Sequence, residues 1–167
     1  MAKRKKPTLR TMAKRLDKAC REYIKERDCQ SCQCCGIHKE ATAQGYLDWS
    51  HKISRNNYIL RWMEFNSVAV CRKCHLEWAQ GISGPTNKAI DRIWGEGTCD
   101  LVEQIAKQYN SVKGTYLDMV DFRLQLETHY KEKLKLLNEG ISVEEVKTAV
   151  WKDFGLDKEN VFDDDEV

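Results

Sequence analysis

The sequence predicts a mainly helical α+β protein in which a short strand–loop–strand–helix unit follows a basic N-terminal helix. Three observations lead to this fold class. Two C-x-x-C pairs, Cys32/Cys35 and Cys71/Cys74, have 35 residues between them. Short stretches with strand-like alternation lie inside that interval, and stretches with helical periodicity lie on both sides of it. A chain of 167 residues has room for one compact core with helical extensions.

The chain opens with a basic segment. Residues 1–27 hold eleven Lys or Arg and three acidic residues, a net charge of +8. We expect residues 1–7 to be disordered and a helix to run from Thr8 to about Arg27, because the apolar residues there recur at helical spacing. A basic arm of this kind is typical of phosphate binding, and an ordinary solvated helix face is the alternative.

The middle of the chain predicts a small metal-stapled finger. Residues 46–51 and 67–71 each suit a short strand. A helix should begin at the second cysteine pair, run through Trp78 and stop at Gly81. Strand, loop, strand and helix around a metal ion form a ββα-metal finger, which together with the N-terminal helix accounts for residues 8–97.

Breaks rich in Gly and Pro divide the rest of the chain into helices. We expect a short helix near residues 86–94 and then a helical C-terminal extension over residues 98–156. The helices of that extension are predicted at about 100–109, 115–137 and 142–154, the last two opened by capping-box sequences. Residues 157–167 form an acidic tail, typical of a solubilising or partner-docking segment or of a frayed terminus.

The cysteines indicate a metal site. No apolar run approaches the ~20 residues that a membrane span needs. The first seven residues are charged with no apolar stretch behind them, so we expect no signal peptide, no membrane partner and a cytoplasmic location. In such a reducing compartment, paired cysteine spacing indicates a metal before a disulfide.

Four thiolates at this spacing suit one tetrahedral, structural Zn²⁺. We expect its ligands to be Cys32, Cys35, Cys71 and Cys74. The first pair is ambiguous, because Cys29 also forms a C-x-x-C with Cys32 and Cys34 lies within reach. We prefer Cys35 because Gly36 follows it and supplies a tight turn. Cys29, Cys34 and Cys99 are then free thiols, and Cys20 is a small core residue on the N-terminal helix.

Three polar residues predict phosphodiester hydrolysis. That reaction needs a base to deprotonate water and a cation to offset charge on the phosphate and the leaving oxygen. His51 is the candidate general base, because neutral imidazole suits this role near pH 7. Asn66 is expected to fix the loop that carries His51, and His75 to bind a catalytic Mg²⁺ or Mn²⁺. His51 taken alone would also fit a satisfied polar residue in a small core.

These motifs resemble the HNH endonucleases. The stretch His51–Arg55, then Arg61–Trp62, Asn66 and the pair Cys71/Cys74, is most similar to the NinG (Rap) recombination proteins of lambdoid phages. It is also similar to the endonuclease VII type of junction resolvase. The resemblance covers about residues 20–80. It implies a metal-dependent endonuclease that cleaves branched DNA, such as Holliday junctions or D-loops, in the host cytoplasm beside phage recombination or packaging proteins.

One position departs from the family pattern. Many HNH sites carry Asp or His directly before the base as a metal ligand, and here that position is Ser50. Asp48 is the nearest carboxylate, and in an extended strand residues 48 and 50 lie on the same side, about 6.6 Å apart. Asp48 can therefore serve the same metal as His75 if the strand bends.

Basic residues in the N-terminal helix and around the proposed site are expected to contact DNA phosphates without reading bases. They are Lys14, Arg15, Lys18, Arg21, Arg55, Arg61, Arg72 and Lys73. Ordinary surface charge is the alternative for each of them.

Other functions stay open at this point. A non-catalytic zinc module that binds DNA through the basic arm would account for Ser50, and an HNH nickase in phage DNA packaging would use the same finger. Symmetric cutting of a junction needs two active sites, so we expect a homodimer formed through the helix at 115–137. The alternative for that helix is packing against the helix at 8–27.

Overall fold

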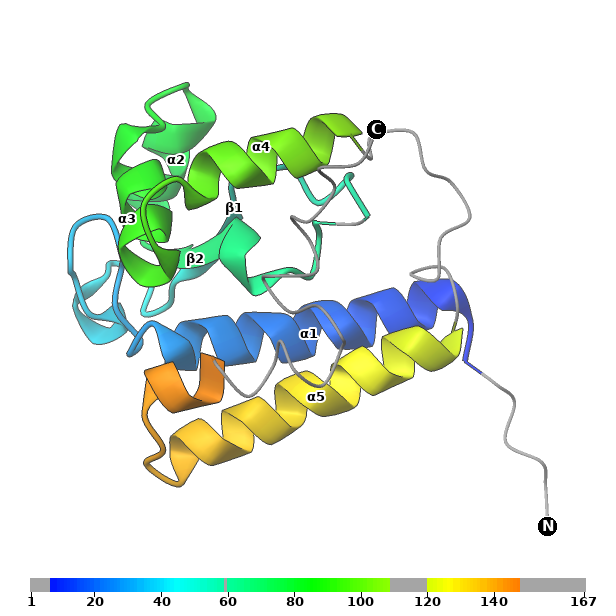
Figure 1. Cartoon of the computed structure of the whole chain (residues 1–167). Coiled ribbons are helices and arrows are strands. Elements are labelled where there is room, and N and C mark those ends of the chain that lie inside the picture. The colour runs from blue at the N-terminus through cyan, green and yellow to red at the C-terminus, as the bar shows by residue number, and fades with distance from the viewer. Residues whose placement is uncertain (1–6, 59, 109–119, 148–167) are drawn as a thin grey trace, which may run out of the picture.

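The computed structural model describes residues 7–58, 60–108 and 120–147. These are mainly helical, with one two-stranded antiparallel sheet (Figure 1), which confirms the predicted fold class at this level. The elements are α1 (Leu9–Arg27), β1 (Asp48–His51), β2 (Ser67–Val70), α2 (Arg72–Ala79), α3 (Gly84–Trp94), α4 (Thr98–Gln108) and α5 (Val120–Asn138). Short 3-10 turns at Lys39–Ala41 and Glu64–Asn66 precede the two strands. None of the helices described here is long and apolar enough to cross a membrane.

Several predicted segments lie outside the described residues. They are the basic tail at 1–6, the start of the long helix at 115–119, the end of the last helix at 148–154 and the acidic tail at 157–167.

Helix α1 forms as its apolar periodicity predicts. Thr8 caps the first turn, because its Oγ accepts a hydrogen bond from the N–H of Thr11 at 3.2 Å. Met12, Leu16 and Tyr23 of the apolar stripe are fully buried, whereas Leu9 at its start is exposed. The helix presents its remaining, largely basic faces to solvent and to the neighbouring segments.

The two strands pair antiparallel, with Asp48 opposite Val70 and His51 opposite Ser67. Because side chains alternate along a strand, Asp48 and Ser50 lie on one side of β1 and Trp49 and His51 on the other. Trp49 belongs to the apolar core that α1 and α5 share. His51 and Asp48 therefore point to opposite faces of the sheet.

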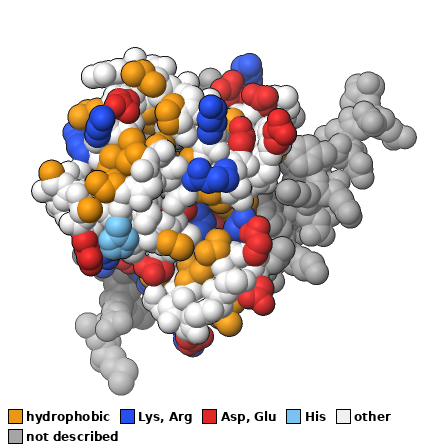
Figure 2. Space-filling model, turned by 90° about the vertical axis from the view of Figure 1, so that its left-hand side faces the viewer, with side chains coloured by type: hydrophobic (Ala, Val, Ile, Leu, Met, Phe, Trp, Pro, Cys, Tyr) orange, Lys and Arg blue, Asp and Glu red, His pale blue; other side chains and the backbone are white. Residues whose placement is uncertain are grey.

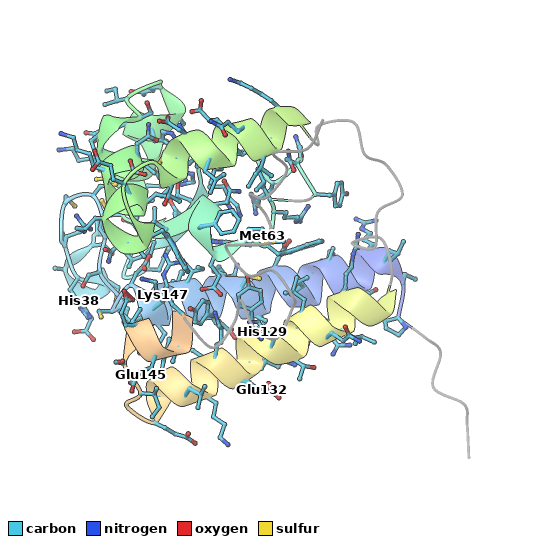
Figure 3. The ribbon with its side chains drawn as sticks, in the orientation of Figure 1. His38, Met63, His129, Glu132, Glu145 and Lys147 are labelled. Atoms are coloured by element: carbon cyan, nitrogen blue, oxygen red, sulfur yellow. The ribbon has the colours of Figure 1, made fainter. Side chains whose placement is uncertain are left out.

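The boundaries of the later helices differ slightly from the predictions. Helix α3 begins at Gly84 rather than near residue 86, because Pro85 occupies the first turn, where its missing N–H costs no helical hydrogen bond. The capping box at Ser142 is confirmed. Ser142 Oγ accepts from Glu145 N at 3.3 Å, and Glu145 Oε2 accepts from Ser142 N at 3.2 Å. Lys147 on this last turn (labelled in Figure 3) donates to Ile93 O of α3 at 2.6 Å.

Helix α5 lies along α1 (Figure 1). Leu126 and Tyr130 of α5 are buried in one cluster with Leu16 and Tyr23 of α1, and the two tyrosine rings stand 5.5 Å apart. Leu126 and Tyr130 are thus covered within the chain, as in the alternative, whereas Leu124 and Leu134 of the same helix are only partly buried. The homodimer stays a prediction.

Buried ion pairs tie the helices to the sheet. Lys133 of α5 donates to Glu64 beside β2, and Glu64 also accepts from Tyr23 Oη at 2.6 Å. Arg27, at the end of α1, pairs with Asp28 at 2.8 Å. Asp28 in turn accepts from the N–H of Ala69 in β2 at 2.6 Å. Both long helices are therefore held against the segment that carries the candidate site.

Candidate metal centre and neighbouring groove

The first cysteine pair lies in a small hairpin, the first knuckle (residues 32–35). The N–H of Cys32 donates to Ile37 O at 2.9 Å, and the N–H of Gly36 donates to Cys32 O at 2.8 Å. Gly36 has φ +76°, a conformation that favours glycine, which confirms its predicted role in the turn. The N–H of Gln33 donates to Ala69 O at 2.9 Å and attaches the knuckle to β2.

Four thiols converge between this knuckle and the start of α2. The Sγ atoms of Cys32, Cys35, Cys71 and Cys74 all lie within 4.8 Å of one another. A tetrahedron with Zn–S bonds of ~2.3 Å has edges of about 3.8 Å. The Sγ atoms of Cys35 and Cys71 are 3.8 Å apart. The cluster therefore fits a tetrahedral metal ion such as zinc, and its members are the four cysteines that the sequence favoured.

The remaining cysteines stay outside this cluster. The exposed Cys29 is not part of it, and Cys20 and Cys99 are buried. The neighbouring Cys34 thiol lowers the pKa of Cys32, whereas burial raises the pKa of Cys35 and of Cys74. A thiolate is the form that a metal requires.

Asp48 and His75 meet on the far side of β1 from His51. The carboxylate Oδ2 of Asp48 lies 3.0 Å from Nδ1 of His75, and Arg72 approaches the same oxygen at 3.4 Å. The predicted pair of candidate ligands is thus brought together. A carboxylate oxygen and an imidazole nitrogen suit Mn²⁺, and Mg²⁺ accepts one or two carboxylates with water completing its shell.

Ser50 does not join this pair. Its side chain is buried, with only 1% of the residue exposed, and its Oγ has no hydrogen-bond partner among the residues that the structure describes. Asp48, two residues earlier on the same side of β1, reaches His75 instead.

His51 is buried at the end of β1, with 6% of its surface exposed. Its Nε2 lies 3.1 Å from the main-chain oxygen of Arg61, and its ring packs on Trp49 with centroids 4.1 Å apart. Burial lowers the pKa of His51 to about 4, so its imidazole is neutral at pH 7. A neutral ring that donates its Nε2 proton to the carbonyl keeps a lone pair on Nδ1.

Asn66 binds the loop that follows His51. Its Oδ1 accepts from the N–H of Ile53 at 2.8 Å, and its Nδ2 donates to the carbonyls of Ile53 and Leu60 at 3.0 and 2.9 Å. The side chain is fully buried and all these bonds go to backbone. The predicted hydrogen bonds of Asn66 are therefore present.

Asp17 of α1 was not predicted to have a role near the site. It accepts from Arg61 Nε at 3.0 Å and from the Arg61 guanidinium at 2.6 Å, and Trp62 Nε1 donates to it at 2.9 Å. These bonds hold the segment of Arg61 in place, and the main-chain carbonyl of Arg61 accepts the hydrogen bond from His51 Nε2. No local motif marks such a residue, because its partners lie more than forty positions away.

A basic groove of about 520 Å³ runs between α1 and the Asp48–His75 pair. Its lining cations from α1 are Lys14, Lys18, Arg21 and Lys25, at the spacing of one helical face. Arg55 and Arg72 line it from the other segments. Partial burial, followed by the charge of Arg21, lowers the pKa of Lys25, as expected where positive charges accumulate.

The structure separates the predicted phosphate contacts into two sets. Lys14, Lys18, Arg21, Arg55 and Arg72 line the basic groove. The other three point to protein partners: Arg15 pairs with Glu127 of α5, Arg61 with Asp17, and Lys73 lies 3.9 Å from Glu77. The end of the molecule formed by the first knuckle, α2 and α3 mixes both signs of charge with apolar side chains (Figure 2).

No family model, curated protein or solved structure matches this chain. The resemblance to the HNH endonucleases therefore rests on the motif residues, and the functional argument rests on the site.

Proposed function

We propose that this protein is an HNH-type endonuclease that hydrolyses phosphodiester bonds in DNA with a catalytic divalent metal. One observation carries the proposal: a groove lined by six Lys and Arg side chains leads to a carboxylate–histidine pair. Cations in a groove attract the phosphate backbone irrespective of sequence. The ligand pair then lies beside the bound phosphates.

In this proposal the residues divide the work. Asp48 and His75 would hold Mg²⁺ or Mn²⁺, which would supply positive charge to offset the negative charge on the phosphate and the leaving oxygen. His51 takes a proton from water through Nδ1, because its Nε2 proton is held by Arg61 O. His51 is buried on the opposite face of β1 from Asp48 and does not line the basic groove. This role therefore requires the end of β1 to open and turn the ring toward the bound phosphate. Asn66 keeps the loop beyond His51 in place through its three backbone hydrogen bonds. The four-cysteine cluster, with zinc bound, holds β2 and α2 in the geometry that presents His75.

The proposed substrate is branched DNA, such as a Holliday junction or D-loop, as the resemblance to phage recombination proteins implies. Nicking during phage DNA packaging would use the same residues, and the choice of substrate distinguishes the two roles.

A non-catalytic zinc module that binds DNA is the second candidate. It is favoured by the burial of His51 and by Ser50, which replaces a family ligand with a buried hydroxyl. In that case the groove would bind phosphate without any hydrolysis.

A cleavage assay tests the proposal. Purified protein is incubated with Mg²⁺ or Mn²⁺ and with junction, D-loop, flap and linear DNA in parallel. We expect metal-dependent cleavage, strongest on branched DNA, that is lost in His75→Ala with the zinc content unchanged. Tight binding without cleavage of any substrate would favour the non-catalytic module.

A further inference from the structure

A second groove continues the basic groove toward the N-terminal end of α1. It has a volume of about 410 Å³ and is lined by Leu9, Arg10, Lys14, Tyr58, Arg61 and Arg123, with no acidic residue among its lining side chains. We call it the tyrosine groove. Lys14 lines both grooves. The Arg61–Asp17 ion pair lies at the boundary between them, because Arg61 lines one groove and Asp17 the other.

The two grooves form one track along α1. From Arg10 to Lys25 the helix advances by fifteen residues, or about 22 Å at 1.5 Å per residue. Cations recur along this length on one face, at residues 10, 14, 18, 21 and 25. A nucleic-acid backbone bound in the basic groove can therefore continue into the tyrosine groove over the same helix.

Tyr58 gives the second groove a different chemistry from the first. The residue is 50% exposed, although its ring contacts the buried Trp62 edge-on, with centroids 6.3 Å apart. Arg61 and Arg123 lie near the same ring, at 5.8 and 5.9 Å from its centroid. The contact with Trp62 orients the ring, and half of the side chain stays accessible.

An accessible aromatic ring beside the exposed side chains of Arg10 and Lys14 suits a nucleobase together with its phosphates. Arg123, which is 3% exposed, and Arg61, which is paired with Asp17, hold the surroundings of the ring in place. Base–aromatic stacking tolerates any sequence, because every base has a π-face, and basic residues follow the backbone. Bases within a duplex already stack on both neighbours, so only an unpaired base can stack on a protein side chain without disrupting the helix. The chemistry of the tyrosine groove thus selects single-stranded DNA.

We propose that the tyrosine groove binds an unpaired DNA strand next to the duplex held in the basic groove, with one base stacked on Tyr58. This inference rests on the proposed function, because it concerns the same DNA, bound along the basic groove. It makes junctions between single and double strands the preferred ligands of the protein.

Binding assays test the inference separately from catalysis. The ligands are oligothymidylate, a blunt duplex, and the same duplex with a single-stranded extension, all without added Mg²⁺ or Mn²⁺. Tyr58→Ala should weaken binding of oligothymidylate and of the extended duplex by about 5- to 150-fold, the range for one stacked base. Binding of the blunt duplex should change less than twofold. Tyr58→Phe keeps the ring and should bind like the wild type.

Crosslinking of the wild-type protein provides a readout that does not depend on variants. Oligothymidylate that carries 5-bromodeoxyuridine should crosslink to Tyr58 on irradiation, as mapped by mass spectrometry. The inference is overturned if Tyr58→Ala binds all three ligands like the wild type, if it loses all of them equally, or if the crosslink maps elsewhere. Absence of cleavage by the wild type would overturn the proposed function and leave these binding results to stand.

Discussion

His51 depends on residues that lie outside its own motif. Its Nε2 proton has the carbonyl of Arg61 as acceptor, and the Arg61 side chain forms two hydrogen bonds with Asp17 on α1. Asp17 also accepts from Trp62, the next residue. A carboxylate on the N-terminal helix therefore fixes the backbone that selects the tautomer of the candidate base.

Replacing Asp17 should impair catalysis more than binding. Asp17→Asn keeps the size of the side chain but removes the charge that holds Arg61, so we expect cleavage to fall about 10-fold, as for other orienting residues. The affinity for DNA should not fall, because the change removes a negative charge from the basic groove. Nitrogen NMR of the His51 ring should show the loss of a single tautomer. Asp100→Asn, an exposed change on α4, is the control, and equal rates for the two variants would remove Asp17 from the account.

The burial of His51 also predicts a pH dependence of stability. Its pKa is about 4 in the folded protein, against an ordinary value of 6.5. The unfolded chain therefore binds the proton first, and the free energy of unfolding should fall by about 1.4 kcal/mol per pH unit between pH 6.5 and 4. Above pH 6.5 this contribution is constant.

Urea unfolding at several pH values measures this effect. His51→Ala lacks the titrating group, so its free energy of unfolding should fall less steeply than that of the wild type over the same interval. Parallel curves would mean that His51 is not buried in neutral form.

At the scale of elements, the cysteine cluster joins pieces that are too short to be stable alone. Each strand has four residues and α2 has eight. The first knuckle contacts β2 through the hydrogen bond from Gln33 N to Ala69 O and through Cys32, which packs in the apolar cluster of the β2 side chains. A bound metal would add four strong links between the knuckle and the start of α2.

Loss of the metal should therefore unfold the finger. Metal analysis of the wild-type protein should find about one zinc ion per chain, and Cys74→Ser should yield insoluble protein or protein without fixed tertiary structure. Near-UV circular dichroism and zinc content provide the measurement, with the exposed Cys29→Ser as the matched control. A well-folded, zinc-free Cys74→Ser protein would show that the finger folds without its metal and would contradict this prediction.

Local patterns predicted the elements well and the long-range contacts poorly. The periodicity of apolar residues located α1, and the two C-x-x-C motifs located the cluster, because both signals lie within a few neighbouring residues. The packing of α5 on α1 stayed one of two alternatives, since an apolar helix face does not identify its partner. Asp17 was missed because its partners, Arg61 and Trp62, lie far away in the sequence. The ion pairs of Arg15 and Arg61 with carboxylates likewise become visible only in the folded structure.

At the scale of the whole molecule, positive charge is concentrated where the grooves lie. The net charge of the chain is only +2, yet α1 contributes four cations to the basic groove and shares Lys14 with the tyrosine groove. An arrangement of this kind makes DNA affinity depend on salt rather than on sequence.

Neutralising the groove should weaken binding to all DNA sequences alike. Changing Lys14, Lys18 and Arg21 to Gln should reduce the slope of log affinity against log salt concentration by roughly 0.9 for each DNA phosphate that the protein no longer neutralises. The control changes Lys88, Lys131 and Lys135, which are exposed residues outside the basic groove, to Gln. Fluorescence anisotropy at several salt concentrations provides the slopes, and the same slope for both triple variants would place the DNA elsewhere.

The most direct test of the account is the single-turnover cleavage rate of His51→Ala on branched DNA with Mg²⁺ or Mn²⁺. The account predicts a rate at least ~10²-fold below the wild type, the usual scale for removing acid–base catalysis, with DNA affinity and zinc content unchanged. A variant that cleaves at the wild-type rate would contradict the assignment of His51 as the base, and with it the proposed mechanism.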